Sequence, residues 1–561
     1  MVDSLIYPQN YEEFKLLSEL EQKKYLYYLP LLKDRLNRIH EIDETELFWE
    51  RVFGFTLLIH IAQCLLVFNS IRKRNIYKEI DSHCRKTKKY RIPWDEKNYR
   101  DIFVNKSLGQ SVLVGIYYKV FNENQCKQSV KKLDLELCEH KTFWDKILSS
   151  NLFELLKEIV IQILHRIRSP KTILFEVYWS RSKQQNIQLA SQGYIQFKKI
   201  DLDNSLNKVF INMKMRRIIS DTSDIIDDFD KFFFRTLKYV IPTSLIERFS
   251  IRKNKAESML SRYPRLENIF NESISPDISL ILALSARMKI KTYYIEHNYL
   301  QHQFLGNNLW YIKRKFDNFL SLGWKTEKKD TKHIASSSNY CWYKTPKKTK
   351  SIKILYISGV ATKFFPHFSS GYGESGEKNS KSYINMKSNF FRSLNDNIVN
   401  KIYYKDYPIK RRDALSEYKN NSKFINGIKS KVHIYDEGDL SDSVELISKS
   451  SLCICDYLST PYNQILLSNT PVIILFNKDT YFLDEEDFYD ELINVGIFHT
   501  NPIEAAIFLN ENFKNITNWW NSKSVQNARK DYLRNNFGQK NQINKYLLGL
   551  GKKKALSCQS L

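Results

Sequence analysis

The sequence predicts an α/β fold with two Rossmann-like lobes and a helical N-terminal region. Short apolar strands alternate with helices over 351–515, a less regular alternation ends near 324, and the first 75 residues carry apolar side chains at helical spacing. Alternating strands and helices build a parallel sheet that helices cover on both faces. Two such units joined by a polar connection predict two lobes with a ligand-binding cleft between them.

Residues 53–71 form an apolar run that is long enough to cross a bilayer. His60, Gln63 and Asn69 interrupt this run, and polar side chains are unfavourable in lipid. We therefore expect a helix buried in a protein core. A membrane span and an interfacial helix are the alternatives.

Four segments are expected along the 561 residues. In the first segment, 171–179 is predicted to be a buried strand and 205–270 to be mostly helical. A polar and basic stretch separates it from the more regular second half. The expected segments are an N-terminal helical region with an acceptor-side α/β lobe (1–324), a connection (325–350), a nucleotide-binding α/β lobe (351–515), and a C-terminal helix and tail (516–561).

The chain is strongly basic, because 87 Lys and Arg residues against 62 Asp and Glu residues give a net charge of +25. Basic residues are spread along the whole sequence, and no zinc-finger, leucine-zipper or RNA-recognition motif accompanies them. We therefore expect no nucleic-acid partner. The charge favours a phosphate-bearing substrate or peripheral contact with an anionic membrane, or it reflects only a Lys-rich composition.

The cysteines and the first residues favour a cytoplasmic protein. Eight cysteines are scattered without a CxxC pair, as is typical of reduced, mostly buried thiols. The opening MVDSLIYPQNYEEF contains acidic residues and no apolar core, unlike a signal peptide. The expected location is the cytoplasm, with peripheral attachment at the inner face of the membrane as an option.

A phosphate site is predicted where an apolar strand ends at Asp456 and a helix begins near Ser459 and Thr460. Free amides at a helix N-terminus bind anions, and the two hydroxyls add hydrogen-bond donors. A plain strand–cap–helix corner would use the same residue types. Lys405 ends another predicted strand and could pair with a phosphate, or it could belong to a solvated basic loop.

The catalytic candidates in the first lobe are Glu296 and His297, which end the predicted strand before a polar loop. Imidazole acts as a base or binds phosphate near neutral pH, although a lone histidine is more often structural. No P-loop, HExxH or GxSxG motif is present. The DxD matches at 201–203 and 228–230 fit a turn and a helix face better than a metal site, so no metal ligands are predicted.

A GxGxxG match at 371–376 follows its strand by about a dozen residues, too far for a dinucleotide fingerprint. We interpret it as a flexible loop, with a cover over donor phosphates as the alternative.

Eight segments spread over most of the chain, among them YYIEHNYLQHQFLG and DYLSTPYNQILLSNTPVIILF, resemble the transferases of bacterial surface-carbohydrate and O-antigen gene clusters. The resemblance implies a GT-B-like pair of lobes, akin to CMP-sugar-dependent transferases of capsule and lipopolysaccharide assembly. This chain has Asn298 where the family usually has Gly, and Lys405 where it usually has Arg, so neither the free backbone of Gly nor the bidentate contact of Arg is available. The matching segments are LLKDRLNRIH, FWERVFGF, YYIEHNYLQHQFLG, FDNFLSLGW, YYKDYP, DYLSTPYNQILLSNTPVIILF, VGIFHTNPIEA and ITNWW.

The resemblance implies a metal-independent glycosyltransferase that moves a sugar from a nucleotide-sugar donor, CMP-linked in one version, to a glycan or lipid-linked acceptor. Ser459, Thr460, Lys405 and Asp456 would hold the donor, and Glu296 or His297 would be the base. No tightly bound cofactor is expected. The alternatives are a CDP-polyol phosphotransferase on the same scaffold and a degenerate, non-catalytic scaffold of the assembly complex.

Overall fold

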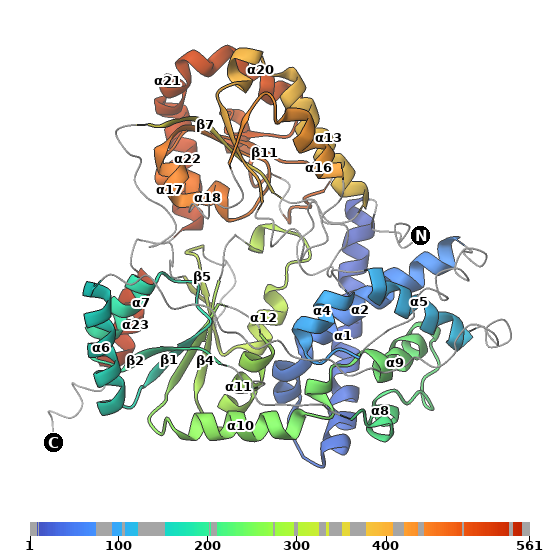
Figure 1. The fold of residues 1–561 in the computed structure, drawn as a ribbon. Helices are drawn as coiled ribbons and strands as arrows, with labels where there is room; N and C mark the ends of the chain where they lie inside the picture. Colours follow the sequence, from blue (N-terminus) through green and yellow to red (C-terminus); the bar gives the residue numbers. More distant parts are fainter. Residues whose placement is uncertain are drawn as a thin grey trace.

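The chain folds into two α/β lobes and a large helical region, seen in a computed structural model (Figure 1). The described residues form two six-stranded sheets, and every strand pairing within both sheets is parallel. This confirms the predicted α/β class, with two Rossmann-like lobes and helices at the N-terminus. The structure describes residues 8, 10–74, 92–103, 107–121, 152–200, 202, 210–272, 275–296, 301–324, 333–335, 350–359, 377–407, 420–435, 443–478, 480–484, 487–537 and 542–552.

The sheet of the N-terminal lobe has the strand order β2-β1-β3-β4-β5-β6. Alternate residues of its strands face opposite cores: Ile173 and Phe175 pack with the helical region, whereas Leu174 packs on the other face. Both faces are therefore covered, as a parallel sheet requires. The strands are β1 Thr172–Phe175, β2 Ile195–Lys198, β3 Asn268–Asn271, β4 Lys291–Ile295, β5 Asn318–Ser321 and β6 His333–Ala335.

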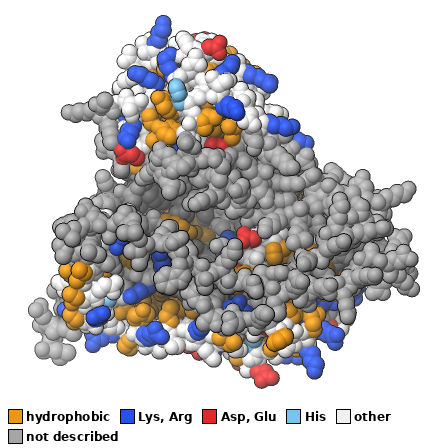
Figure 2. Space-filling model, viewed as in Figure 1, with side chains coloured by type: hydrophobic (Ala, Val, Ile, Leu, Met, Phe, Trp, Pro, Cys, Tyr) orange, Lys and Arg blue, Asp and Glu red, His pale blue; other side chains and the backbone are white. Residues whose placement is uncertain are grey.

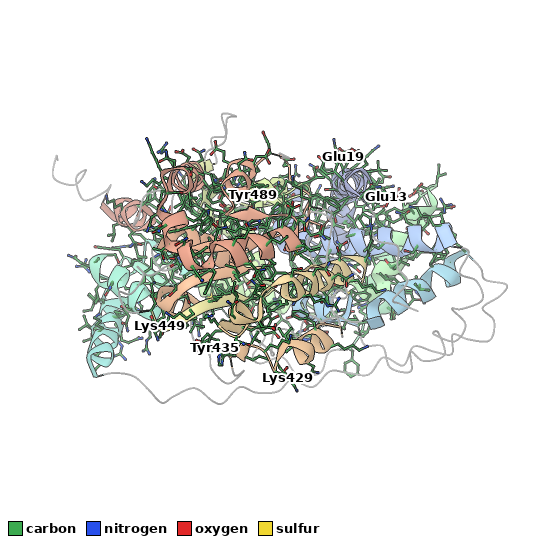
Figure 3. The ribbon with its side chains drawn as sticks, turned by 90° about the horizontal axis from the view of Figure 1, so that it is seen from above. Glu13, Glu19, Lys429, Tyr435, Lys449 and Tyr489 are labelled. Carbon is green, nitrogen blue, oxygen red and sulfur yellow. The ribbon has the colours of Figure 1, made fainter. Side chains whose placement is uncertain are left out.

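The sheet of the C-terminal lobe has the order β12-β11-β10-β7-β8-β9, which is the doubly wound order of dinucleotide-binding folds. In Figure 3, which views the molecule from above, the labelled residues Tyr489 and Tyr435 lie well apart in the drawing. Tyr435 directly follows β9. The strands are β7 Ile352–Ile357, β8 Ile402–Lys405, β9 His433–Ile434, β10 Ser450–Cys455, β11 Val472–Leu475 and β12 Phe498–His499.

The helices of the first half build the helical region and cover the first sheet (Figure 1). Ser275 caps α11 by accepting a hydrogen bond from the Ile278 amide at 3.3 Å, with Pro276 in the first turn. These helices are α1 Tyr11–His40, α2 Glu46–Arg74, α4 Glu96–Phe103, α5 Ser107–Phe121, α6 Leu152–Ile167, α7 Arg181–Ala190, α8 Met213–Ile219, α9 Asp228–Val240, α10 Phe249–Ser261, α11 Pro276–Arg287 and α12 Leu309–Lys315.

The helices of the second half surround the second sheet, except for the last one. Helix α23 leaves that lobe and packs on the first sheet, where Ile543 and Leu547 are fully buried beside α7 (Figure 1). The helices are α13 Glu377–Ser393, α14 Asp396–Val399, α16 Asn420–Ile428, α17 Ser443–Lys449, α18 Thr460–Ser468, α19 Asp490–Asn494, α20 Pro502–Asn512, α21 Ile516–Asn521, α22 Lys523–Asn536 and α23 Gln542–Lys552.

Strands β3 and β6 lie where the sequence analysis predicted other structure. Helices α8, α9 and α10 lie within 205–270, which was predicted to be mostly helical, but the buried central strand β3 at its end was not predicted. It has only four residues with asparagine at both ends, too few to show a two-residue periodicity. Strand β6 lies inside 325–350, so part of the expected connection completes the first sheet.

Helix α2 contains the apolar run and is the one helix of the described chain that is long and apolar enough to cross a membrane. In the structure, 89% of its most apolar window is buried, because α2 packs between α1, α9 and α11. Arg51 ties it to the first lobe: its guanidinium donates to the carbonyls of Lys315 (2.7 Å) and Leu282 (2.9 Å) and to the Asp317 carboxylate (3.0 Å). The helix thus has the contacts expected of a core helix.

The polar residue His60 of α2 has partners on both ring nitrogens. Nδ1 lies 2.8 Å from the Tyr99 hydroxyl and Nε2 lies 2.7 Å from the Thr236 hydroxyl. Burial lowers the pKa of His60 to about 3, because a charged imidazolium would lose its hydration there. The ring is therefore neutral in the folded protein at neutral and mildly acidic pH.

The three cysteines that the structure describes, Cys64, Cys453 and Cys455, are buried. On the face drawn in Figure 2, Lys and Arg side chains are spread over the described parts of both lobes and do not form one continuous patch. That distribution agrees with the even spread of basic residues along the sequence.

We expect His60 to make folding stability fall as the pH is lowered. Its folded pKa is depressed, so the unfolded chain takes up a proton below about pH 6.5 that the folded protein does not. Between pH 7 and pH 5 the free energy of unfolding should fall by about 2 kcal/mol from this group. Urea unfolding of the native protein and of His60→Gln at both pH values checks this. The deficit of the variant should shrink by that amount at pH 5, and parallel profiles would contradict it.

Candidate functional site

The candidate site lies at the carboxyl ends of the C-terminal lobe strands. The strand order reverses between β7 and β10, and in open α/β sheets ligands bind outside the carboxyl ends at this point. Three chain segments meet there: the turn after β7, the end of β8, and the segment that leads from β10 into α18. Predicted donor-site residues occupy two of them.

Asp456 ends β10 and is completely buried. One carboxylate oxygen accepts hydrogen bonds from the Gly359 amide (2.8 Å) and the Tyr383 hydroxyl (2.7 Å), and the other accepts from the Tyr356 hydroxyl (2.9 Å). Its carboxylate therefore holds the turn after β7 against the start of α13. The predicted contact between Asp456 and a ligand stays a prediction, since in this structure its described partners are protein groups.

Lys387 on α13 is a buried charge that the sequence analysis missed. Its ammonium donates to the Ser358 hydroxyl at 3.2 Å and to the Tyr404 hydroxyl at 3.4 Å. Burial raises the pKa of Asp456, and the positive charge of Lys387 opposes that rise. A lysine within the apolar stripe of Tyr383 and Phe390, at helical spacing, was the available signal.

The turn after β7 has no room for a side chain at position 359. A Cβ at Gly359 would lie 2.7 Å from Cγ of Tyr457, so only glycine lets the backbone approach this ring. The close approach brings the turn beside the segment that enters α18.

Ser459 and Thr460 are half-buried at the start of α18, as predicted. Ser459 occupies the N-cap position, but within the described residues its hydroxyl does not bond to a helix amide. Lys405 is half-buried at the end of β8, where its carbonyl accepts a hydrogen bond from the Ser358 amide at 3.0 Å. The structure thus places Lys405, Asp456 and the Ser459 helix start along one edge of one sheet.

In the N-terminal lobe, Glu296 follows β4 and is completely buried. Its carboxylate accepts hydrogen bonds from the Leu322 amide (2.8 Å) and from the Trp324 indole (2.7 Å). These contacts make Glu296 an anchor for the turn after β5. His297 lies outside the described residues, and its predicted catalytic role stays a prediction.

The loop that carries His297 reaches the C-terminal lobe a few residues later. Gln303 donates to the Tyr462 hydroxyl of α18 at 3.2 Å and also bonds to the Tyr489 hydroxyl. His302 stacks on Trp324 with ring centroids 4.2 Å apart. The loop after β4 and the start of α18 therefore meet across the boundary between the lobes.

A cavity of about 540 Å³ opens beside this edge. The first residues of α1, the start of α13 and the segment after β11 line it, and its lining includes Lys378, Lys478 and Tyr481. The Tyr481 hydroxyl accepts a hydrogen bond from the Leu458 amide at 3.3 Å, which joins the cavity wall to the segment before α18. A volume of this size matches small-molecule sites.

Among the described residues, no group of three His, Cys, Asp or Glu side chains could hold a metal. The DxD match at 228–230 starts α9, where Asp230 pairs with Lys24 and Tyr28. It therefore belongs to the helical region, as the sequence suggested. Most of 201–203, and the loop at 371–376, lie outside the described residues.

We expect Asp456 and Lys387 to stabilise the fold as a coupled pair. Asp456→Asn removes a negative charge that acts on the buried Lys387 ammonium, and Lys387→Met removes a positive charge that acts on the buried Asp456 carboxylate. Each should lower the free energy of unfolding by about 2–4 kcal/mol. The double variant should lose at least about 1 kcal/mol less than the sum of the single losses. Urea unfolding measures all four proteins, with the exposed Lys429→Met (Figure 3) as control. Additive losses would contradict the pairing.

The solved structures that the chain matches are distant. Acinetobacter baumannii MurG is 11% identical, with 68% of this chain and 100% of that chain covered and a TM-score of 0.34. Anabaena HepE, solved with UDP and glucose, is 9% identical over 70% and 100%, with a TM-score of 0.36. The Methanocaldococcus jannaschii UDP-GlcNAc 2-epimerase, solved with UDP-GlcNAc and UDP, is 13% identical over 68% and 98%, with a TM-score of 0.35. No curated protein sequence matches the chain.

The family comparison covers nearly the whole chain. The profile described as LIC12162 family transferase matches residues 7–549. That range includes the helical region, both sheets and most of α23, so the match concerns the complete architecture and not one lobe. The chain belongs to the LIC12162 family of transferases.

Proposed function

We propose that this transferase moves a sugar from a nucleotide-sugar donor to a glycan or lipid-linked acceptor during bacterial surface-polysaccharide assembly. The observation that carries the proposal is the doubly wound C-terminal sheet, whose strand-order reversal is lined by Lys405, Ser358 and the start of α18. Nucleotides bind at this position in such sheets. The O-antigen setting comes from the resemblance of the sequence motifs.

The donor phosphates would bind at Ser459 and Thr460. The N-cap hydroxyl of Ser459 is not used to cap the helix within the described residues, so hydroxyl and first-turn amides can serve an anion together. Lys405 would add a positive charge from the end of β8, which β7 separates from β10. Leaving-group charge would then be met by helix amides and a cation.

The acceptor would enter from the N-terminal lobe, with His297 as the proposed base. Support comes from the contact of Gln303 with Tyr462, which brings the loop after β4 to α18. Glu296, buried against Trp324, would position this loop and not exchange protons with the acceptor. The cavity beside Tyr481 offers space for part of a substrate.

We expect the double change of Ser459 and Thr460 to Ala to weaken binding of the donor nucleotide about tenfold or more, through lost hydrogen bonds to charged oxygens. Calorimetry with UDP-, GDP- and CMP-sugars and a CDP-polyol identifies the nucleotide and measures the loss. Ser522→Ala, at another N-cap whose hydroxyl does not cap its helix, is the matched control and should leave affinity unchanged. Equal affinity in the double variant would refute the phosphate site, and tight binding of the CDP-polyol alone would favour polyol-phosphate transfer.

We expect His297→Ala to lower the rate of sugar transfer at least about 100-fold while donor affinity stays within twofold, because a general base acts on the acceptor hydroxyl. Nucleotide release from the donor identified by calorimetry, with a membrane extract as the source of acceptor, measures the rate. His433→Ala, an exposed histidine on β9, should keep full activity. A fall in donor affinity as large as the fall in rate would instead make His297 a donor contact.

A further inference from the structure

We infer that helix α6 attaches the protein to an anionic membrane surface by an apolar stripe on its outer side. This inference goes beyond the proposed function and does not depend on which group is transferred. The stripe, called here the α6 stripe, is defined by its members Ile159, Val160, Ile163 and Ile167.

The α6 stripe is a continuous apolar surface that faces solvent. Ile159, Ile163 and Ile167 follow one another at four-residue spacing and therefore share one side of the helix. They are 50%, 50% and 70% exposed, and Val160 beside them is 47% exposed. Single exposed apolar residues are common, but a row of four β-branched side chains along one helix marks an interaction surface.

The opposite side of α6 contacts the lobe through both polar and apolar side chains, and half-buried Leu164 lies beside Gly193 there. His165 bonds to the Gln188 side chain at 2.9 Å, Lys157 donates to the Asn186 side chain at 3.4 Å, and Ile161 is the buried apolar residue between them. A surface helix normally turns its apolar side inward and its polar side to water. In α6 most of the large apolar side chains whose placement is described point outward, so they must serve a contact outside the lobe.

The charge around the stripe selects a membrane as the occupant. Arg166 is exposed in the last turn of α6, and Arg168, which directly follows the helix, is also exposed while its guanidinium donates to the Tyr194 hydroxyl at 2.8 Å. An amphipathic helix with basic residues beside its apolar face lies in the interface of a bilayer and prefers anionic lipids. The net charge of +25 adds long-range attraction to such a surface.

The position of α6 permits this contact. Figure 1 shows α6 at the outer side of the N-terminal lobe, away from the C-terminal lobe, and Figure 2 shows hydrophobic side chains gathered at the same corner beside Lys and Arg. A flat surface can therefore reach the α6 stripe without closing the boundary between the lobes.

The test is co-sedimentation of the full-length protein with vesicles of phosphatidylglycerol and phosphatidylethanolamine, and with phosphatidylcholine vesicles for comparison. The native protein should bind the anionic vesicles at least tenfold more strongly than the neutral ones. Ile163→Glu with Ile167→Glu should abolish binding without lowering the melting temperature, because both residues are exposed. Ile251→Glu with Ile507→Glu, at isoleucines that are 49% and 47% exposed elsewhere, is the matched control and should keep binding.

Replacing Arg166 and Arg168 by Gln should weaken binding about fivefold for each arginine at low salt.

Three outcomes would overturn the inference: no binding of the native protein to anionic vesicles, an equal loss in the Ile251 and Ile507 control, or a dimer in solution that the Ile163 and Ile167 change converts to monomer. The last result would make the α6 stripe an interface between two copies. Nucleotide affinity, measured on the same variants, separates this test from that of the proposed function.

Discussion

The geometry of the candidate site depends on one buried carboxylate, that of Asp456. A parallel sheet places its loops at one edge but does not by itself fix their distances from one another. Asp456 does so, because it gathers hydrogen bonds from the turn after β7, from β7 itself and from α13. The positive charge of Lys387 opposes the rise that burial causes in the pKa of Asp456. The approach of Gly359 to Tyr457 follows from this arrangement, so the same constraint places the turn beside the entrance to α18.

A second set of contacts links the two lobes through aromatic and amide side chains. Glu296 holds Trp324, Trp324 stacks on His302, and the next residue, Gln303, bonds to Tyr462 and Tyr489. A chain of specific contacts therefore runs from the end of β4 to the first turn of α18. The two predicted halves of the site are connected by this chain and are not merely opposite each other.

Elements with a clear pattern in consecutive residues could be predicted from the sequence, whereas elements and residue roles without such a pattern could not. Strand β10 and the Ser459 helix start were recognisable because an apolar run ends in Asp456 and is followed by helix-starting residues. Strand β3 was missed because four residues with asparagine at both ends carry no periodicity. The roles of Lys387 and Glu296 depend on partners distant in sequence, and strand-end position alone does not distinguish a buried anchor from a residue open to a ligand.

The return of α23 to the first lobe has a consequence for how the chain is made. Ile543 and Leu547 complete the core between α7 and the first sheet, where they cover Leu174 and Phe270. Yet they are translated only after the entire second lobe. During synthesis the apolar face of the first lobe that Ile543 and Leu547 cover is therefore still uncovered while the second lobe emerges. The two lobes follow one another in the gene, but the core of the first lobe is completed after the second lobe has been synthesised.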